Sequence, residues 1–224
     1  AIVVRSGATP VVRDSSFVDG GGINIFEGSS PLIEGNELEG GPGIYGDFGD
    51  DTRILDNHIH GPGQQGVDMG SAAAAVIRGN TVSDKTDGMW ISGGALVEGN
   101  AVSNGVNTGI TVVEADVAAG TPTIRGNTLT DNLLGISWNT EEGVIEGNAI
   151  SGGEGGIRFV QGAPEVRENQ VTGATANGLW LSSLAAPTLS GNTICGNATN
   201  VGIFGDAPLR DDGTNEICED APSE

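Results

Sequence analysis

The feature that most constrains this chain is a short motif that recurs along nearly its whole length. Its clearest copy, residues 122–130, reads Pro-Thr-Ile-Arg-Gly-Asn-Thr-Leu-Thr; other copies keep an apolar residue, an asparagine usually preceded by glycine, and a second apolar residue. The anchoring asparagines are Asn36, Asn57, Asn80, Asn100, Asn127, Asn148, Asn169 and Asn192, with Ser15 in the same place of an earlier copy. Such spacing, twenty-odd residues, is typical of proteins built from stacked copies of one structural unit.

Each copy contains three short segments in which apolar and polar residues alternate, separated by glycine-rich turns. The first segment precedes the anchoring asparagine, the second follows it, and the third resembles Gly-Ile-Arg-Phe at residues 156–159. Alternation with a period of two predicts strands, and the segments are too short for helices. Stacked copies therefore predict an all-β coil with three parallel sheets around an apolar bore. The wider spacing after Asn100 indicates an inserted loop at residues 114–121.

Alignment of the copies predicts which side chains become neighbours, about 4.8 Å apart, which is the strand spacing in a sheet. One inward column contains Val12, Ile33, Ile54, Ile77, Val97, Ile124, Ile145, Val166 and Leu189. A second contains Phe17, Leu38, Ile59, Val82, Val102, Leu129, Ile150, Val171 and Ile194. The stacked asparagine amides are expected to hydrogen-bond along the coil axis.

An outward column gives independent support for this alignment, because its charges mostly alternate in sign. It reads Arg13, Glu34, Leu55, Arg78, Glu98, Arg125, Glu146, Arg167 and Ser190. Opposite charges on adjacent strands stabilise a sheet, whereas like charges destabilise it. The alternation therefore indicates which strands are neighbours, and it assigns several of the few basic residues to structural pairs.

The pattern Pro-x-Ile-x-Gly-Asn-x-Ile resembles the right-handed parallel β-helix repeat family over nearly the whole chain. That family includes carbohydrate-binding and sugar-hydrolase-type (CASH) domains and the copper-accessory proteins of nitrous oxide reductase, and it shares its architecture with pectate lyases, polygalacturonases and alginate epimerases. The resemblance implies a single-stranded right-handed parallel β-helix of about nine coils. Fold and function are separate inferences, because sites rather than folds carry chemistry.

The two cysteines fall in one column on consecutive copies, because residues 214–218 repeat the frame of residues 192–195. Cys195 and Cys218 are therefore expected to form a disulfide that closes the C-terminal edge, worth roughly 3 kcal/mol. A disulfide implies an oxidising compartment; the alternative is two free thiols in a cytosolic protein. We expect one domain at residues 1–218 and a tail or linker at residues 219–224.

Composition narrows the possible partners and locations. The formal charge of the 224 residues is −21 and the only lysine is Lys85, which argues against nucleic acid and anionic membrane surfaces as partners. The longest apolar run, residues 72–77, is far too short to span a membrane. The chain begins with Ala1 and has no visible secretory signal, so we expect a mature secreted protein or an excised piece, located outside the cell, in the periplasm or at the cell surface.

The sheet of third segments is predicted to carry aromatic side chains on its outer face, although only 4% of the chain is aromatic. One outward column reads Asn24, Tyr45, Asp68, Trp90, Thr111, Ser137, Arg158, Trp180 and Phe204. Exposed rings between polar groups mark a binding surface. We therefore expect Tyr45, Trp90, Arg158, Trp180 and Phe204 to bind a ligand, with Arg158 stacked on Trp180. The open alternative is that the inserted loop or a partner subunit covers these rings.

Two aspartates on this face are the candidates for catalysis. Asp68 lies in the aromatic column and Asp47 in the next outward column; both could also hold Ca²⁺ through oxygen ligands. The Trp-Ile-Ser-Gly stretch at residues 90–93 resembles the Trp-Ile-Asp-His of pectate lyases, but Ser92 and Gly93 replace its Asp and His. Catalysis is thus an open question; the enzyme classes compatible with the resemblance are polysaccharide lyase, C5-epimerase and glycoside hydrolase.

Both histidines of the protein lie in a second group of residues with metal-ligand chemistry. Glu37 and Glu39 occupy positions on one copy that correspond to His58 and His60 on the next. The four side chains are expected to form a grid about 5 Å by 7 Å on one face. Imidazole with carboxylate suits zinc, copper or nickel. The alternative is two solvated Glu–His pairs without a metal.

The sequence thus favours an extracellular β-helix that recognises a polysaccharide along the third-segment sheet, with processing of that polysaccharide as an open alternative. Tyr45, Trp90 and Trp180 would stack on sugar rings, while Asp47, Asp68 and Arg158 contact polar groups. The rival interpretation is a non-catalytic stalk or sensor ectodomain, a homodimer or part of a larger multidomain protein, in which the aromatic face contacts protein.

Overall fold

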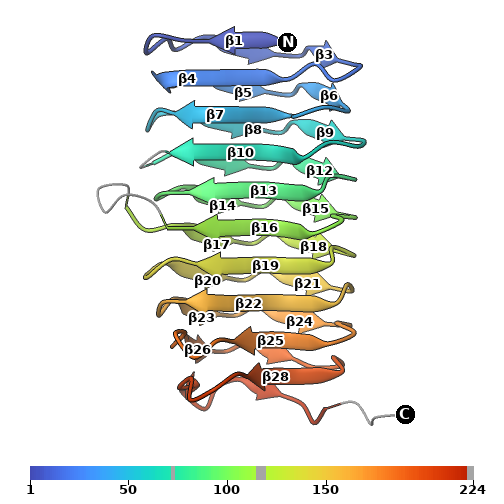
Figure 1. Ribbon diagram of the computed structural model, residues 1–224, viewed down its shortest axis with the longest axis vertical. Coiled ribbons are helices and arrows are strands. Elements are labelled where there is room, and N and C mark those ends of the chain that lie inside the picture. The colour runs from blue at the N-terminus through green and yellow to red at the C-terminus, as the bar shows by residue number, and fades with distance from the viewer. Residues whose placement is uncertain (72–73, 115–119, 221–224) are drawn as a thin grey trace.

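The computed structural model describes residues 1–71, 74–114 and 120–220, and this part of the chain consists of strands and turns. The chain winds into a right-handed parallel β-helix, in which every coil contributes one strand to each of three sheets (Figure 1). Each sheet contains ten strands within the described residues, close to the predicted nine coils. None of the described residues forms an apolar helix of membrane-spanning length.

Sheet A is built from the third segments and has the longest strands, which cross the front of Figure 1. All neighbouring strands in it are parallel. Its strands are β1 (Ile2–Val4), β4 (Ile23–Ser29), β7 (Ile44–Phe48), β10 (Gln65–Ser71), β13 (Asp87–Ser92), β16 (Thr108–Val113), β19 (Leu134–Asn139), β22 (Gly155–Gln161), β25 (Asn177–Leu181) and β28 (Thr199–Ile203).

Sheets B and C are built from the first and second segments of each copy. Sheet B contains β2 (Val11–Arg13), β5 (Leu32–Glu34), β8 (Arg53–Leu55), β11 (Val76–Arg78), β14 (Leu96–Glu98), β17 (Thr123–Arg125), β20 (Val144–Glu146), β23 (Glu165–Arg167), β26 (Thr188–Ser190) and β29 (Arg210–Asp211). Sheet C contains β3 (Ser16–Phe17), β6 (Glu37–Glu39), β9 (His58–His60), β12 (Thr81–Ser83), β15 (Ala101–Ser103), β18 (Thr128–Thr130), β21 (Ala149–Ser151), β24 (Gln170–Thr172), β27 (Thr193–Ile194) and β30 (Glu216–Ile217).

The apolar core fills the bore of the coil, as the alternation predicts. Both predicted inward columns are buried, except that Phe17 in the first coils is only partly buried. Sheet A adds larger side chains, including Trp138 and Phe159, which are fully buried. The indole Nε1 of Trp138 donates to the carbonyl oxygen of Thr140 (3.0 Å), so its burial leaves no unpaired donor.

The anchoring asparagines form a continuous ladder of side-chain hydrogen bonds along the axis. Nδ2 of Asn127 donates to Oδ1 of Asn148 (2.9 Å) and to the carbonyl oxygen of Val97 (3.0 Å). Its Oδ1 accepts from the backbone N–H and from Nδ2 of Asn100, both at 2.9 Å. The same pattern links Asn36, Asn57, Asn80, Asn100, Asn127, Asn148, Asn169, Asn192 and Asn215. The predicted ladder is therefore confirmed.

The outward charge column of sheet B is also confirmed. Arg78, Glu98 and Arg125 are register partners on three consecutive strands. The carboxylate of Glu98 lies between the two guanidinium groups, 2.6 Å from Nε of Arg78 and 2.7 Å from Arg125. A further pair joins Arg167 to Glu146 at 3.1 Å. Because these side chains are partly exposed, each pair contributes about 0–1 kcal/mol, but together they favour a single register.

The predicted disulfide closes the last two coils. Cys195 and Cys218 are bonded, with Cα atoms 4.9 Å apart and a sequence separation of 23. Asn200 holds the chain just beyond the disulfide, because its Nδ2 donates to the carbonyl oxygens of Cys218 and Glu219, both at 2.9 Å. The first part of the predicted tail thus contacts the last coil, while residues 221–224 lie outside the described residues.

One predicted neighbour on sheet A is wrong. The sequence alignment placed Phe204 beside Trp180, whereas the structure pairs Trp180 with Gly202. The alignment matched Gly202 to the glycine that begins earlier third segments, such as Gly178; in the last coil Asn200 takes that place. Asn200 does so because its side chain ties the neighbouring turn and the C-terminal segment together. Phe204 therefore lies two residues beyond its predicted position.

Candidate functional site

The outer face of sheet A carries the predicted aromatic column. The register places Asn24, Tyr45, Asp68, Trp90, Thr111, Ser137, Arg158 and Trp180 side by side on successive strands. Tyr45, Trp90 and Trp180 are partly exposed and Arg158 is exposed. Between Trp90 and Arg158, the small side chains of Thr111 and Ser137 are 7% and 6% exposed. On this face, partly exposed aromatic rings are therefore separated by small, buried polar side chains.

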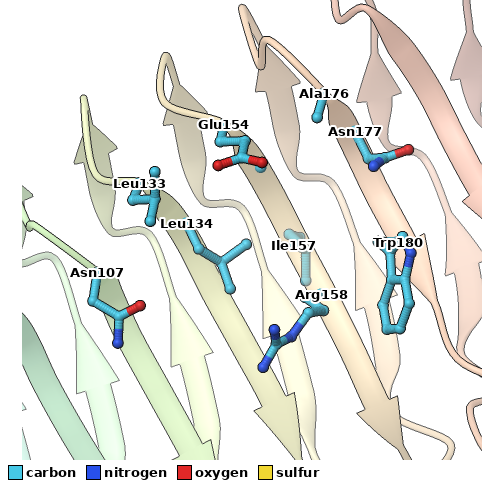
Figure 2. Close-up of a pocket in the computed structure, with 10 residues that line it drawn as sticks. Asn107, Leu133, Leu134, Glu154, Ile157, Arg158, Ala176, Asn177 and Trp180 are labelled. Atoms are coloured by element: carbon cyan, nitrogen blue, oxygen red, sulfur yellow. The ribbon is translucent and has the colours of Figure 1, made fainter.

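A cavity of about 330 Å³ opens beside Trp180, at the edge of sheet A where the chain arrives from sheet C (Figure 2). We refer to it as the Trp180 cavity. Its lining combines apolar, amide and charged side chains: Asn107, Leu133, Leu134, Glu154, Gly155, Ile157, Arg158, Ala176, Asn177 and Trp180. The residues come from four consecutive coils, so the cavity is elongated along the rod axis.

One residue in the lining of the Trp180 cavity, Gly155, has no side chain. Gly155 is paired with Leu134 on one side and with Asn177 on the other. A Cβ at Gly155 would lie 2.9 Å from Cδ1 of Leu134, which leans into the space. Asn107 is held at the rim because its Nδ2 donates to Oδ1 of Asp87 (2.9 Å). Asn107 is thus positioned by a side chain of the preceding coil.

Trp180 has an aromatic neighbour, but not the cationic one that the sequence suggested. Its ring stacks near that of Phe204, with centroids 6.4 Å apart and planes 22° apart. Phe204 is 66% exposed and so extends the aromatic surface toward the C-terminal coil. Figure 2 shows the guanidinium of Arg158 directed away from the indole of Trp180. A cation–π contact is present instead between Arg5 and Phe26, 5.1 Å apart.

A second cavity, of about 470 Å³, lies near the N-terminal end of the same face. It is lined by Gly41, Pro42, Tyr45, Gly63, Gln64, Gln65 and Asp68, and we refer to it as the Asp68 cavity. Burial raises the pKa of the Asp68 carboxyl above its ordinary value of 3.8. Next to Tyr45, the buried Oδ1 of Asn24 has no hydrogen-bond partner among the described residues. The region therefore offers several polar atoms and one ring to a ligand.

Only one of the two catalytic candidates lines the Asp68 cavity. Asp68 lines the cavity, but the cavity has no second carboxyl among the described residues. Asp47 lies further along the strand, and its Oδ1 would be 2.8 Å from a Cβ at Gly70. No third His, Cys, Asp or Glu among the described residues joins these two carboxylates as a compact ligand group. The roles of Asp68 and Asp47 as catalysts and as Ca²⁺ ligands stay predictions.

Lys85 lies behind the Asp68 cavity rather than in it. It is 1% exposed, and its Nζ donates to the carbonyl oxygens of Gly41 (3.2 Å) and His60 (3.3 Å). Burial lowers the pKa of Lys85, and the neighbouring Asp84 carboxylate opposes this shift. The lysine therefore links the chain at Gly41 to the chain at His60 by hydrogen bonds from the interior.

On sheet C, three of the four predicted metal ligands come together. One ligand atom from each of Glu37, His58 and His60 lies within 4.8 Å of the others. Glu39, the register partner of His60, is not part of this group. The second compact group of this kind among the described residues is Cys195, Glu216 and Cys218, but its two sulfur atoms are bonded to each other.

Several residues of the Trp180 cavity were not identified from the sequence. Leu133, Glu154 and Ala176 lie in the turns between sheets C and A, outside the regular outward columns. A usable signal was Gly155, because it occupies a position that holds Leu134 and Asn177 on the flanking coils. A missing side chain between two large ones indicates a hollow.

The comparisons with known proteins agree with this architecture. The sequence profile described as "Right handed beta helix region" matches residues 1–117 and 42–194, which together span most of the chain. The chain has no significant match among curated proteins or solved structures. The repeat, the three parallel sheets and the profile match lead to one conclusion: the chain belongs to the right-handed β-helix family.

Proposed function

We propose that this protein binds a polysaccharide along the outer face of sheet A. The observation that carries the proposal is the Trp180 cavity, in which a partly exposed indole borders about 330 Å³ of space lined by Arg158, Glu154, Asn107 and Asn177. Aromatic rings pack against the apolar faces of sugar rings, and amide and charged groups hydrogen-bond to hydroxyls or carboxylates. The mixed lining of this cavity suits such a ligand.

A polymer fits this surface better than a single sugar. A neighbouring hollow of about 630 Å³ shares Leu133, Glu154 and Ala176 with the Trp180 cavity and continues over the turns between sheets C and A. Further along the same face lie Trp90 and then the Asp68 cavity with Tyr45. These features form an extended surface with several places for a chain of sugar units.

The charge of the protein restricts which polysaccharides bind well. With a formal charge of −21, the protein repels polyanions over long range. We therefore infer that the ligand is a neutral or cationic glycan, or an acidic one whose carboxylate pairs locally with Arg158. The disulfide between Cys195 and Cys218 supports an extracellular, periplasmic or cell-surface location, where such glycans occur.

A glycan array followed by titration calorimetry tests the proposal. Trp180→Ala is expected to weaken binding by about 0.5–1.5 kcal/mol, because stacking of the sugar ring is lost. Leu184→Ala serves as the matched control, since Leu184 is 72% exposed and lines neither cavity. Trp90→Ala measures how far the ligand extends toward the Asp68 cavity. Absence of any glycan ligand, or equal affinities for Trp180→Ala and wild type, would reject the proposal.

A protein-contact function is the second candidate, and the exposed apolar side chains of the last coils favour it. Ile203 is 47% exposed and Phe204 66% exposed, close to the end of sheet A. In this interpretation the protein is a non-catalytic stalk or sensor domain and Phe204 contacts another chain. Light scattering distinguishes the two: a stable dimer that dissociates in Phe204→Ser, without glycan binding, would favour protein contact.

A further inference from the structure

Apart from the cavities of sheet A, the described residues contain a compact group of metal-ligating atoms on the outer face of sheet C. We propose that Glu37, His58 and His60 bind one divalent transition-metal ion, for which Zn²⁺ is the representative. Both histidines of the protein take part. Two imidazole nitrogens and a carboxylate oxygen are ligands that zinc, copper and nickel accept readily.

The backbone places these side chains together. Strands β6 and β9 are parallel neighbours, in which Glu37 is the register partner of His58. His58 and His60 point to the same face, because they are two residues apart on one strand. Their rings lean together until the centroids are 4.4 Å apart and the planes 26° apart. The Glu37 carboxylate reaches diagonally, so that its Oε1 is 3.4 Å from Nε2 of His60.

One nitrogen in this group lacks the partner that its burial requires. Nε2 of His60 is buried and forms no hydrogen bond within the described part of the chain. The 3.4 Å contact with Glu37 does not satisfy it, because it lacks hydrogen-bond geometry. A buried polar atom without a partner costs about 1–3 kcal/mol. A metal ion between the nitrogen and the carboxylate would supply a partner for both.

The three ligand atoms are arranged almost as in a zinc site, but they lie slightly too far apart. Zinc–ligand bonds of about 2.0–2.1 Å in tetrahedral geometry place donor atoms about 3.3 Å apart. The three ligand atoms lie within 4.8 Å of one another, so binding needs a modest contraction. Glu37 and His58 are exposed and can rotate, whereas His60 is partly buried. Three protein ligands leave at least one coordination position for water or for an exogenous group.

Charge around the group also favours a cation. Glu39 is on the same face of β6, and the whole protein carries −21. Lys85 contacts the group only from the interior, through the backbone carbonyl of His60, and is therefore not in competition with an ion for the imidazoles.

Calorimetric titration of the intact protein with Zn²⁺ tests the assignment, after removal of metal with a chelator. Wild type is expected to bind one equivalent. His58→Ala removes an exposed ligand. Loss of a residue that only hydrogen-bonds to a metal ligand lowers metal affinity by about 10- to 100-fold, so loss of the ligand itself should weaken binding by about 100-fold. Glu37→Gln should also weaken binding. Glu39→Gln is the matched control, because it removes the same charge from the same strand face but lies outside the group.

Substitution with Co²⁺ gives a second readout, because its visible absorption reports nitrogen coordination directly. The spectrum expected for wild type should be lost in His58→Ala and kept in Glu39→Gln. The assignment is overturned if wild type shows no saturable binding, if His58→Ala binds as wild type does, or if Glu39→Gln weakens binding as much as Glu37→Gln. Unchanged thermal unfolding of the variants without metal would show that the fold is intact.

Discussion

Asn127 and Asn148, 21 residues apart in sequence, lie one above the other inside the rod, and Nδ2 of the first donates to Oδ1 of the second over 2.9 Å. The Oδ1 of Asn127 receives two further donors from Asn100. Between the ends of the ladder, each side-chain amide thus donates a hydrogen bond to the asparagine of the next coil and accepts hydrogen bonds from the asparagine of the preceding coil. Because every atom of the buried amide is paired, the ladder stabilises one register and excludes a shift of the coils.

Asn127→Ala should destabilise the protein by about 3 kcal/mol, because the backbone N–H and Nδ2 of Asn100 lose their acceptor and the Val97 carbonyl loses a donor. Denaturant unfolding measures the change. Asn139→Ala is the control, since Asn139 is a partly exposed residue at the end of a sheet A strand and should change stability by less than about 0.5 kcal/mol. Similar losses for the two variants would contradict the role of the ladder.

Lys85 should make stability depend on pH in the alkaline range. Burial holds its pKa below the ordinary 10.5, so the folded protein releases this proton more readily than the unfolded chain. The cost of burying the charge is therefore fully present below the folded pKa and disappears as pH rises toward 10.5. Lys85→Met should remove this rise in stability. Unfolding free energies of both proteins from pH 7 to 10.5 measure it, and parallel curves would refute it.

Asp68 should make stability depend on pH in the acidic range, because the folded protein favours its protonated form. Burial raises its folded pKa above 3.8, so the folded protein favours the protonated carboxyl. Its favourable contribution is present below 3.8 and is lost as pH rises through the folded pKa. Asp68→Asn should therefore be more stable than wild type at pH 7 but equally stable at pH 3. Asp47→Asn controls for the loss of one negative charge; if it stabilises as much, burial of Asp68 is not the cause.

The disulfide should act locally on the last coils. Its loop of 23 residues corresponds to about 3 kcal/mol of loop-closure entropy. In a stacked array each coil contacts only its neighbours, so Cys195→Ser with Cys218→Ser should release the amides of β27, β28 and β30. Hydrogen exchange should show faster exchange there and unchanged exchange in β14, β17 and β20. A uniform increase along the rod would argue against local action.

The regular part of this fold could be predicted from sequence because two independent patterns agree. The apolar columns define what faces the bore, and the alternation of Arg78, Glu98 and Arg125 defines which strands touch. The predicted register is wrong in the last coil of sheet A. At Gly202 a glycine repeats the earlier motif, but the hydrogen bonds of Asn200 set the register of the last coil. The several hydrogen bonds of the Asn200 side chain determine the register more strongly than the position of one glycine does.

The candidate sites were predicted less completely than the fold, again for physical reasons. The outward column correctly aligned Tyr45, Asp68, Trp90, Arg158 and Trp180, because alternation determines the face of each side chain. The cavities depend in addition on turn residues and on how far long side chains lean, which a column does not encode. The direction of the Arg158 guanidinium and the diagonal reach of the Glu37 carboxylate are of this kind.

The constant rise of the rod has a consequence for the length of any ligand that it selects. Five strand steps separate β10, which carries Asp68, from β25, which carries Trp180, and at about 4.8 Å per step this is about 24 Å. An oligomer shorter than this distance cannot contact Asp68 and Trp180 at the same time. A longer one can engage both, and its second contact then becomes intramolecular. Affinity plotted against oligomer length should therefore show a threshold, whose position is set by the number of intervening coils.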